Sequence, residues 1–579
     1  MTNGDIAEAF ETIGKILELQ DANPFRIRAY ARAAQTIANL SRGLSDVYDE
    51  GGLPALQEIP GIGKDLSLKI EELLTTGKLA YLEELSAAVP TGLLEMMEIE
   101  GLGPKRTRII YEQFGVSDIP GLEALVASGK LAELKGWGET SAKNVLRGIE
   151  TRKTLHERLP IHRALPVARS IVELLRESGL CGRVEIAGSL RRRKETIGDI
   201  DILATSEKVP EVMELFCAMP MVRHVLAKGE TKSSVNLKLG LDADLRVVDE
   251  DVFGAALYYF TGSKEHNVHV RSLAVRKGIT INEYGVFKGT AREKGTLMAS
   301  RTEEDVFDAV GLPYVPPEMR EDWGEVALAL EGKLPRLIEE GDLKGDLHVH
   351  SDFSDGSASM EEMAAAAKAK GLEYIAVTDH ASAMGMVKGI KEENIGDYLR
   401  RIEAARAKVP GIRILAGAEV DIEDDGSLYL PDSALKQLDW VVASVHGKFR
   451  QTREEMTARI VRAIENPFVR VLGHPTARLL GKRPPVEADM EKVLRAAKGA
   501  GVAVELNASP ERLDLNDIHC KRAKELGVKI AIDSDAHHPK DLDCAVGVSQ
   551  ARRGWVEAAD VLNALPWAAF EKLLLKRRS

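Results

Sequence analysis

Three aspartates have the residue type and spacing of a divalent-metal site. Asp199 and Asp201 are separated by one apolar residue, and Asp244 lies in a later segment that also has a strand pattern. Side chains two positions apart in a strand share a face, so the first two carboxylates point the same way and Asp244 can join them from a neighbouring strand. Three hard oxygen ligands suit a pair of Mg²⁺ (or Mn²⁺) ions that hold a triphosphate and activate a hydroxyl.

A Gly-Ser pair precedes these aspartates. Gly188-Ser189 predicts a tight turn whose amide and hydroxyl can hold phosphate oxygens, and Arg192 follows within a run of three arginines that can neutralise developing charge. An isolated Asp-x-Asp is more often a solvated strand end. The turn, the arginines and the third aspartate together favour nucleotidyl transfer.

A second constellation begins at Asp346. His348 and His350 lie two apart in an expected strand and therefore face the same way. Five later segments place a histidine or carboxylate directly after an apolar strand, which predicts a metal site because isolated structural histidines would not recur in this way. The predicted ligands are His348, His350, Asp355, His380, Glu419, His446, His474, Asp535 and His537.

The first 150 residues show helical patterns broken by Gly-x-Gly turns. Such turns, each followed by an amphipathic helix, form the helix-hairpin-helix pattern, in which the backbone approaches a DNA phosphate and helix-start amides bind it. A third and weaker copy lies at 134–138. The two clear copies contain Gly61, Gly63 and Lys64, and Gly101, Gly103 and Lys105.

The order of expected helices and strands changes near residue 315. Helices and strands alternate over 160–250, and a mixed segment with a helix over 267–277 continues to Pro313. A largely helical connector is expected over 318–340. From Asp346 onward, short apolar strands alternate with Ala-rich helices, which predicts a parallel barrel whose chemistry lies at the carboxyl ends of its strands.

Length, net charge and cysteine spacing limit the classes of protein to which the chain can belong. A chain of 579 residues, 44% hydrophobic, is long enough for several domains, and its net charge of −12 requires any DNA site to be a local patch. The four cysteines form no CxxC pair, and no signal peptide or membrane span is evident. We expect a cytoplasmic monomer that does not enter a membrane.

The first 315 residues resemble the family X DNA polymerases, most specifically in the segment Tyr259-Phe-Thr-Gly-Ser263 followed by Asn282-Glu-Tyr284. The resemblance implies that Asp199 and Asp201 bind both metal ions, and that Asp244 binds the catalytic ion and helps to deprotonate the primer 3′-hydroxyl. It further implies phosphate contacts from Gly188, Ser189 and Arg192, sugar contacts from Tyr259, Phe260 and Gly262, a base contact from Asn267, a template contact from Arg271 and a role in closure for Arg246.

Some positions depart from the family pattern. Lys264 replaces an aspartate beside the nucleotide base, which puts nucleotide affinity or closure in doubt. In the N-terminal domain, Lys69 matches the Schiff-base lysine of the deoxyribose-phosphate lyase domain, and Arg26 and Tyr30 match its phosphate pocket. Two other basic positions of that pocket are Gln57 and Asp65, and an acidic residue there weakens 5′-phosphate binding.

Residues 340–575 resemble the PHP phosphoesterase domain, and all nine family ligand positions are present. The resemblance implies three divalent metals, for which mixed imidazole and carboxylate ligands favour Mn²⁺, Zn²⁺ or Fe²⁺ over Mg²⁺. The implied ligand sets are His348, His350, Glu419 and Asp535; Glu419, His446 and His474; and Asp355, His380 and His537. A metal-bound water would attack the phosphodiester.

The expected fold is multidomain: helical helix-hairpin-helix domains, an α+β nucleotidyltransferase palm and thumb, and an α/β distorted (β/α)7 PHP barrel. The expected boundaries are 1–90 for the lyase-like domain, 91–155 for the fingers, 156–252 for the palm, 253–317 for the thumb, 318–340 for the linker and 341–579 for the PHP domain.

The expected function is a polymerase that fills short gaps in base-excision repair, using gapped or primer-template DNA and dNTPs. The PHP domain adds 3′–5′ exonuclease activity, and cleavage at abasic sites is a further expectation. One alternative is a DNA-end-binding scaffold with a vestigial palm and an active nuclease. Another is transfer to a small substrate, which the paired helix-hairpin-helix turns disfavour.

Overall fold

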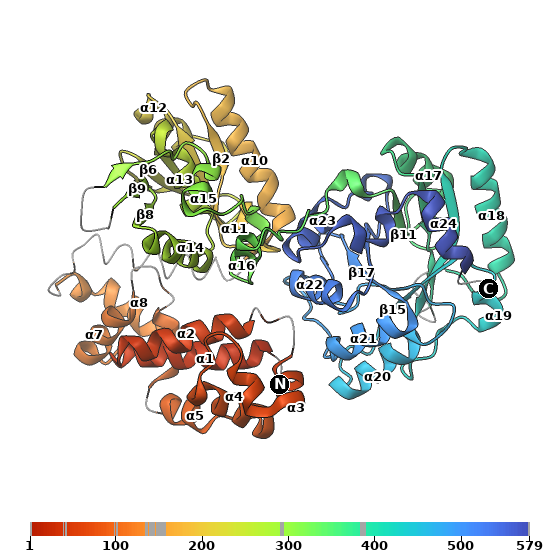
Figure 1. The fold of residues 1–579 in the computed structure, drawn as a ribbon, viewed down its shortest axis with the longest axis horizontal. Helices are drawn as coiled ribbons and strands as arrows, with labels where there is room; N and C mark the ends of the chain where they lie inside the picture. The colour runs from red at the N-terminus through yellow and green to blue at the C-terminus, as the bar shows by residue number, and fades with distance from the viewer. Residues whose placement is uncertain are drawn as a thin grey trace. The chain divides into compact units, whose positions relative to one another are not determined.

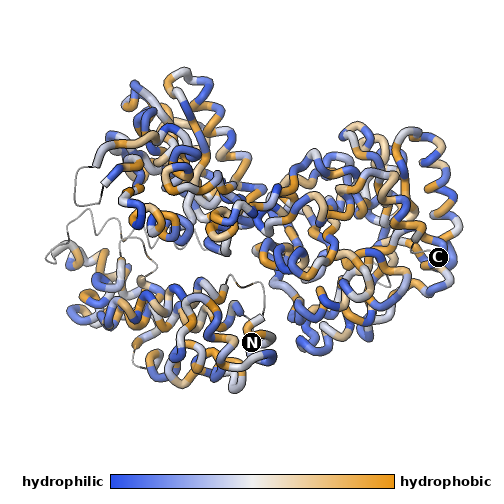
Figure 2. The backbone as a smooth tube through the Cα atoms, in the orientation of Figure 1, coloured by the Kyte–Doolittle hydropathy of each residue, from blue (hydrophilic) through white to orange (hydrophobic). Residues whose placement is uncertain are grey.

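The computed structural model describes residues 3–38, 40, 43–87, 89–97, 99, 102–133, 137, 145, 158–289, 295–382 and 389–576. The chain divides into two compact units, Met1–Glu157 and Arg158–Ser579. Along the described helices, apolar residues alternate with polar ones, the pattern of helices that bury one face (Figure 2). None of these helices is both long and apolar enough to cross a membrane.

The first unit is helical. Its described helices are α1 (Asn3–Leu19), α2 (Pro24–Ala38), α3 (Leu44–Gln57), α4 (Lys64–Thr76), α5 (Ala80–Ala87), α6 (Thr91–Met97), α7 (Pro104–Phe114) and α8 (Ile119–Ala127). They enclose two apolar cores, one around Phe10 and Ile70 and the other around Met96 and Ile110. Gly63 and Gly103 are the N-caps of α4 and α7, so each Gly-x-Gly turn leads into a helix.

The palm is a five-stranded sheet in the order β2-β4-β7-β6-β5. Its strands are β2 (Val184–Ile186), β4 (Asp199–Thr205), β5 (Val222–Lys228), β6 (Lys232–Leu237) and β7 (Asp242–Val248). Helices α10 (Ile161–Glu177) and α12 (Val209–Cys217) pack on one face, where β4 contributes Ile200 and Ile202. The four-residue helix α11 (Gly188–Arg191) follows β2, and β1 (Leu159–Pro160) pairs with β3 (Thr196–Ile197).

The thumb follows the palm and has its own apolar core, which includes Tyr258, Val270 and Phe307. It contains α13 (Phe253–Thr261), α14 (Lys264–Arg276), β8 (Ile279–Asn282), β9 (Gly285–Lys288), β10 (Thr296–Leu297) and α15 (Glu303–Val310). A capping box at Thr302 starts α15, and Gly311 ends it in the left-handed conformation.

The expected largely helical connector is wrong. Over 318–340 the only α-helix is α16 (Glu325–Leu330), and turns and extended chain make up most of the remainder. Gly324 and Gly332 have positive φ and bracket this helix, and Pro335 follows it. These residues end helices, so the apolar pattern of the segment reflects burial against its neighbours instead.

The C-terminal region is a parallel barrel surrounded by helices (Figure 1). Seven strands follow in sequence order, and a bridge between Val349 and Ala536 links the first strand to the segment after the last, as the barrel prediction required. The strands are β11 (Gly345–Val349), β12 (Tyr374–Val377), β14 (Arg413–Asp421), β15 (Trp440–Ser444), β16 (Val471–Leu472), β17 (Ala503–Asn507) and β18 (Ile530–Asp533), with β13 (His380–Ala381) pairing beside β14.

The barrel helices are α17 (Met360–Ala369), α18 (Ile395–Lys408), α19 (Asp432–Leu435), α20 (Arg453–Ile464), α21 (Met490–Ala500), α22 (Asp517–Leu526), α23 (Ala545–Arg553) and α24 (Trp567–Lys576). Apolar residues on their inner faces and the outward-facing residues of the strands form the main core. This packing places the carboxyl ends of the strands together at one rim.

Candidate active sites

Strand pairing brings the palm aspartates together. Strands β4 and β7 are parallel neighbours, and Asp201 lies directly opposite Asp244 in their register. Asp199 and Asp201 alternate with the core residues Ile200 and Ile202, so they project from the opposite face of the sheet. Two distant segments therefore place three carboxylates on one face.

Burial and mutual repulsion raise the pKa of two of these carboxylates, Asp199 and Asp201. Burial raises the pKa of Asp201 to about 7, and the charges of Asp199 and Asp244 add to the shift. The pKa of Asp199 is raised for the same reasons. Lys232 Nζ lies 2.5 Å from Asp244 Oδ2 and offsets part of this charge. The groups of described residues whose ligand atoms lie close enough to hold one ion do not include these three aspartates.

The Gly-Ser turn lies against the same carboxylates. Gly188 has φ +62°, and a Cβ on it would lie 2.1 Å from Asp201 Oδ2, so only glycine fits this position. The hydroxyl of Ser189 is buried and has no hydrogen-bond partner in the described part of the chain. A buried hydroxyl without a partner, next to the glycine that packs against Asp201, fits a hydrogen bond to a bound phosphate oxygen.

Arg192 is already held by protein atoms. Its Nε donates to Glu321 Oε1 at 3.0 Å, and its Nη1 donates to the carbonyl oxygen of Thr261 at 2.6 Å. That carbonyl belongs to the end of α13, next to Gly262, whose φ is +68°. The predicted phosphate-binding arginine therefore joins the palm turn to the predicted sugar-binding segment.

Of the remaining predicted contacts near the palm, Tyr259, Phe260, Asn267 and Arg271 lie on thumb helices, and Arg246 lies on the palm strand β7. Tyr259 and Phe260 form an edge-on aromatic pair, and the guanidinium of Arg246 lies 4.5 Å from the Phe260 ring centre. Asn267 Nδ2 donates to the Tyr259 carbonyl at 2.8 Å, which leaves its buried Oδ1 without a partner among the described residues. Arg271 lies half-buried on α14.

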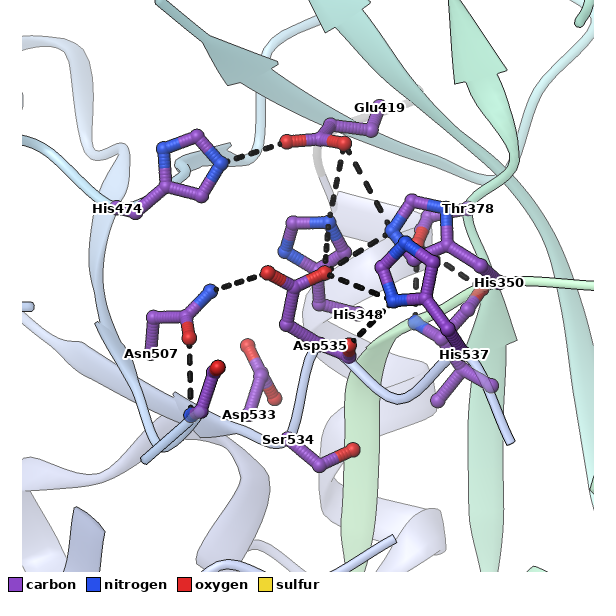
Figure 3. A network of polar contacts seen from close by, with 12 residues as sticks. His348, His350, Thr378, Glu419, His474, Asn507, Asp533, Ser534, Asp535 and His537 are labelled. Atoms are coloured by element: carbon purple, nitrogen blue, oxygen red, sulfur yellow. Dashed lines mark hydrogen bonds and ion pairs between the residues drawn. The ribbon is translucent and has the colours of Figure 1, made fainter. Parts of the chain in front are cut away.

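The barrel rim gathers the predicted metal ligands (Figure 3). Glu419 is central: its Oε1 lies 2.9 Å from His474 Nε2 and 3.2 Å from His446 Nε2, and its Oε2 lies 2.9 Å from His380 Nδ1. Three groups bring ligand atoms within 4.8 Å of one another: His350, Asp355, His380 and His537; His348, His350 and Asp535; and His380, Glu419 and His446.

These groups partly match the ligand sets implied by the resemblance. Asp355, His380 and His537 meet as one set, with His380 Nε2 and His537 Nε2 at 3.3 and 3.4 Å from Asp355 Oδ2. His350 joins that group as well as the one with Asp535, and His380 also reaches Glu419. His350 and His380 therefore each lie close to two candidate ligand groups, and each would bind an ion in one of them.

Burial and the neighbouring carboxylates shift the pKa values of the rim histidines in opposite directions. His348 Nε2 and His350 Nδ1 are buried with no hydrogen-bond partner among the described residues. Burial lowers the pKa of His350 to about 3, which leaves a neutral imidazole free to ligate. Burial opposes protonation of His380, but the charge of Glu419 outweighs it and raises the pKa of His380 to about 11. Metal binding would release that proton.

Three residues that the sequence analysis missed hold the ligands in place. Glu505 Oε1 lies 2.6 Å from His348 Nδ1, and Asp421 Oδ1 lies 2.7 Å from His446 Nδ1. Asn507 Nδ2 donates to Asp535 Oδ2 at 2.9 Å. Such partners orient metal ligands. The sequence signal that could have identified them is a polar residue within, or at the end of, an otherwise apolar strand.

In the N-terminal unit, Lys69 is 15% exposed, and its Nζ lies 2.6 Å from Asp65 Oδ1 and 5.4 Å from the Tyr81 ring centre. Gly61 has φ +88° in the turn before Gly63, and Lys64 begins α4. Gly103 and Lys105 lie at the start of α7, whereas Gly101 and the weaker copy's glycines lie outside the described residues.

Four family models match the chain. They are a helix-hairpin-helix domain (residues 1–79), a SAM-like helix-hairpin-helix tandem (93–151), the DNA polymerase beta thumb (256–321) and the PHP domain (346–509). The matched segments include most of the predicted barrel ligands, but not the palm aspartates Asp199, Asp201 and Asp244, nor Asp535 and His537.

Individual proteins extend the comparison. The chain is 37% identical over 567 residues to the DNA polymerase/3'-5' exonuclease PolX of Bacillus subtilis (strain 168), covering 97% of this chain and 98% of that protein. It is 28% identical to DNA polymerase lambda of Rattus norvegicus, over 55% of this chain and 56% of that protein. A probable phosphatase of Thermoanaerobacter sp. (strain X514) is 37% identical over 33% of this chain and 78% of that protein.

Proposed function

This chain belongs to the family X DNA polymerases that carry a PHP domain, and we propose that it fills short gaps in DNA during base-excision repair and trims 3′ ends. The register of Asp201 against Asp244, beside the turn at Gly188, carries the polymerase assignment. The buried histidine and carboxylate cluster around Glu419 carries the nuclease assignment.

In the palm, Asp199 and Asp201 would hold two Mg²⁺ or Mn²⁺ ions, with Asp244 on the ion beside the primer terminus. Bound there, the ions would supply Lewis-acid stabilisation of the phosphoryl oxygens and an acidified 3′-hydroxyl. Asp244 accepts the hydroxyl proton directly or through water. Ser189 and Arg192 orient the triphosphate, while Tyr259 and Asn267 face the sugar and base.

In the barrel, three ions of the Mn²⁺, Zn²⁺ or Fe²⁺ type would be held by the three ligand sets that the family resemblance implies. Bound ions would supply an acidified water as the nucleophile. Glu505 and Asp421 hold the ligand imidazoles in the tautomer that directs their other nitrogen to the site. Cleavage at abasic sites is an extension of the same phosphodiester chemistry.

The substrates are gapped or primer-template DNA and dNTPs. The helix-hairpin-helix turns at Gly61-Gly63 and at Gly103 support binding to the DNA backbone, because each precedes a helix whose first amides are available to phosphate. The extended similarity to a bacterial polymerase supports a cytoplasmic location in association with DNA. We propose that the protein acts as a monomer.

A labelled primer on a one-nucleotide gapped duplex tests both activities. We expect dNTP-dependent extension, and Mn²⁺-stimulated 3′ shortening when dNTPs are omitted. Asp244→Asn should abolish extension and spare shortening, while Asp535→Asn should do the reverse. Loss of both activities in either variant would contradict two independent sites, and shortening without any extension by the wild type would indicate a DNA-binding scaffold with an inactive palm.

A further inference from the structure

The PHP domain holds the nucleotide-binding turn of the palm at two points. Arg553, the last residue of α23, donates from Nη1 to the backbone carbonyl of Arg192 at 2.7 Å. Arg478, in the segment after β16, places Nη2 at 2.7 Å from Glu195 Oε2. Both contacts reach the short segment that leads from the Gly-Ser turn to the metal-binding strand.

Glu321 completes this arrangement. Its Oε1 accepts from Arg192 Nε at 3.0 Å and from Arg553 Nη1 at 2.9 Å, and Lys194 Nζ lies 3.6 Å from its other oxygen. The side chains of Glu321 and Arg553 are 8% and 3% exposed. A single buried carboxylate is therefore shared by a palm arginine and a PHP arginine.

These contacts fix the orientation of the Arg192 side chain. Its Nε donates to Glu321 and its Nη1 donates to the Thr261 carbonyl, while Nη2 donates no hydrogen bond to any described residue. A long side chain fixed before its ligand arrives loses less conformational freedom when it binds. Arg192 therefore has one nitrogen left to present to a phosphate oxygen in a defined direction.

We propose that Glu321 and Arg553 are positioning residues for nucleotide binding, through which the PHP domain sets the orientation of Arg192 toward the triphosphate. The proposal rests on the proposed phosphate contact of Arg192. Without Arg553, Glu321 loses the buried cation that fixes its carboxylate, and Arg192 loses its anchor. The polymerase would then keep its metal-binding aspartates but bind dNTPs less tightly.

The same interface supplies a matched control. Arg552, the neighbouring residue on α23, places Nε at 2.8 Å from Glu318 Oε1 and donates from Nη1 to the Ile338 carbonyl. It joins the same helix to the same linker, yet neither Arg552 nor Glu318 forms a hydrogen bond or ion pair with Arg192 among the described residues. Arg553 also places Nη2 at 2.7 Å from Asp517 Oδ2, so an effect through Arg192 requires that Glu321→Gln raise KM as well as Arg553→Gln.

The test is single-nucleotide gap filling by the full chain, with KM for the correct dNTP and kcat determined separately. We expect Glu321→Gln and Arg553→Gln to raise KM by about fivefold or more with little change in kcat, because coupling between sites is commonly of this size. Arg552→Gln should leave KM unchanged. Glu321→Asp keeps a carboxylate and should therefore raise KM less than Glu321→Gln does. Exonuclease activity on single-stranded DNA confirms folding of each variant.

A double variant distinguishes a failure of this inference from a failure of the proposed phosphate contact of Arg192. In an Arg192→Met background, Glu321→Gln should add no further increase in KM, because Glu321 acts through Arg192. An unchanged or lowered KM for Glu321→Gln, with exonuclease activity intact, would overturn the inference, as would additivity of the two changes. An unchanged KM for Arg192→Met alone would instead overturn the proposed phosphate contact.

Discussion

Glu505 Oε1 lies 2.6 Å from Nδ1 of His348, and both side chains are completely buried. The contact fixes the imidazole so that Nε2 faces Glu419 and Asp535, at 3.5 and 3.7 Å. A carboxylate on the far nitrogen of a ligand histidine also increases its basicity toward a metal. Glu505 thus sets the direction of a proposed metal ligand without belonging to the proposed ligand set itself.

Glu505→Gln should therefore weaken metal binding by the PHP domain by roughly 10- to 100-fold while keeping the shape of the site. The measurement is exonuclease rate against Mn²⁺ concentration, in which the half-saturating concentration rises and saturating metal restores most of the rate. Extension by the palm provides the internal control. An unchanged Mn²⁺ dependence would show that Glu505 serves only to pack the barrel.

The palm should bind Mg²⁺ less tightly in acid. The pKa of Asp201 is raised to about 7, so below that pH a proton occupies the carboxylate and competes with the ion. Mg²⁺ affinity should rise with pH until Asp201 is ionised and then level off. Titration of extension against Mg²⁺ at pH values below and above this pKa measures the effect, and a pH-independent half-saturating concentration would contradict it.

Gly188→Ala should inactivate the palm. The added Cβ meets Asp201 Oδ2 at 2.1 Å, and the φ of +62° adds about 1 to 3 kcal/mol of backbone strain. Displacement of Asp201 should reduce extension at least tenfold, since metal geometry depends on it. Gly179→Ala is the matched control, because φ there is +66° with open space around the new Cβ. Equal losses of activity in both variants would attribute the effect to strain alone.

Lys69→Ala should abolish borohydride trapping of a 5′-deoxyribose-phosphate end if the N-terminal unit is a lyase. Asp65 lies 2.6 Å from the amine of Lys69 and places negative charge where a 5′-phosphate would bind. Asp65→Asn should therefore increase trapping by the otherwise unchanged protein. Equal trapping by wild type and Lys69→Ala would exclude this lysine as the nucleophile.

Local patterns in the sequence determined the chemistry and the fold class. The one-residue spacing of Asp199 and Asp201, and of His348 and His350, implies a shared face because a strand repeats every two residues. The alternation of helices and strands over 160–250 and the parallel barrel after Asp346 were predicted and are present in the structure. Family membership, inferred from the motifs, is confirmed by similarity along nearly the whole chain.

Only the tertiary structure decided which distant residues meet. The sequence predicted that Asp244 would join the other two aspartates, but only the structure gave its register with Asp201. The partners Glu505 and Asp421 and the contact of Arg553 with Glu321 join distant segments and had no signal in the local pattern. The connector over 318–340 was misjudged for the same reason. Its apolar residues pack against neighbours that periodicity cannot reveal, because buried contacts and not helical propensity hold the segment in place.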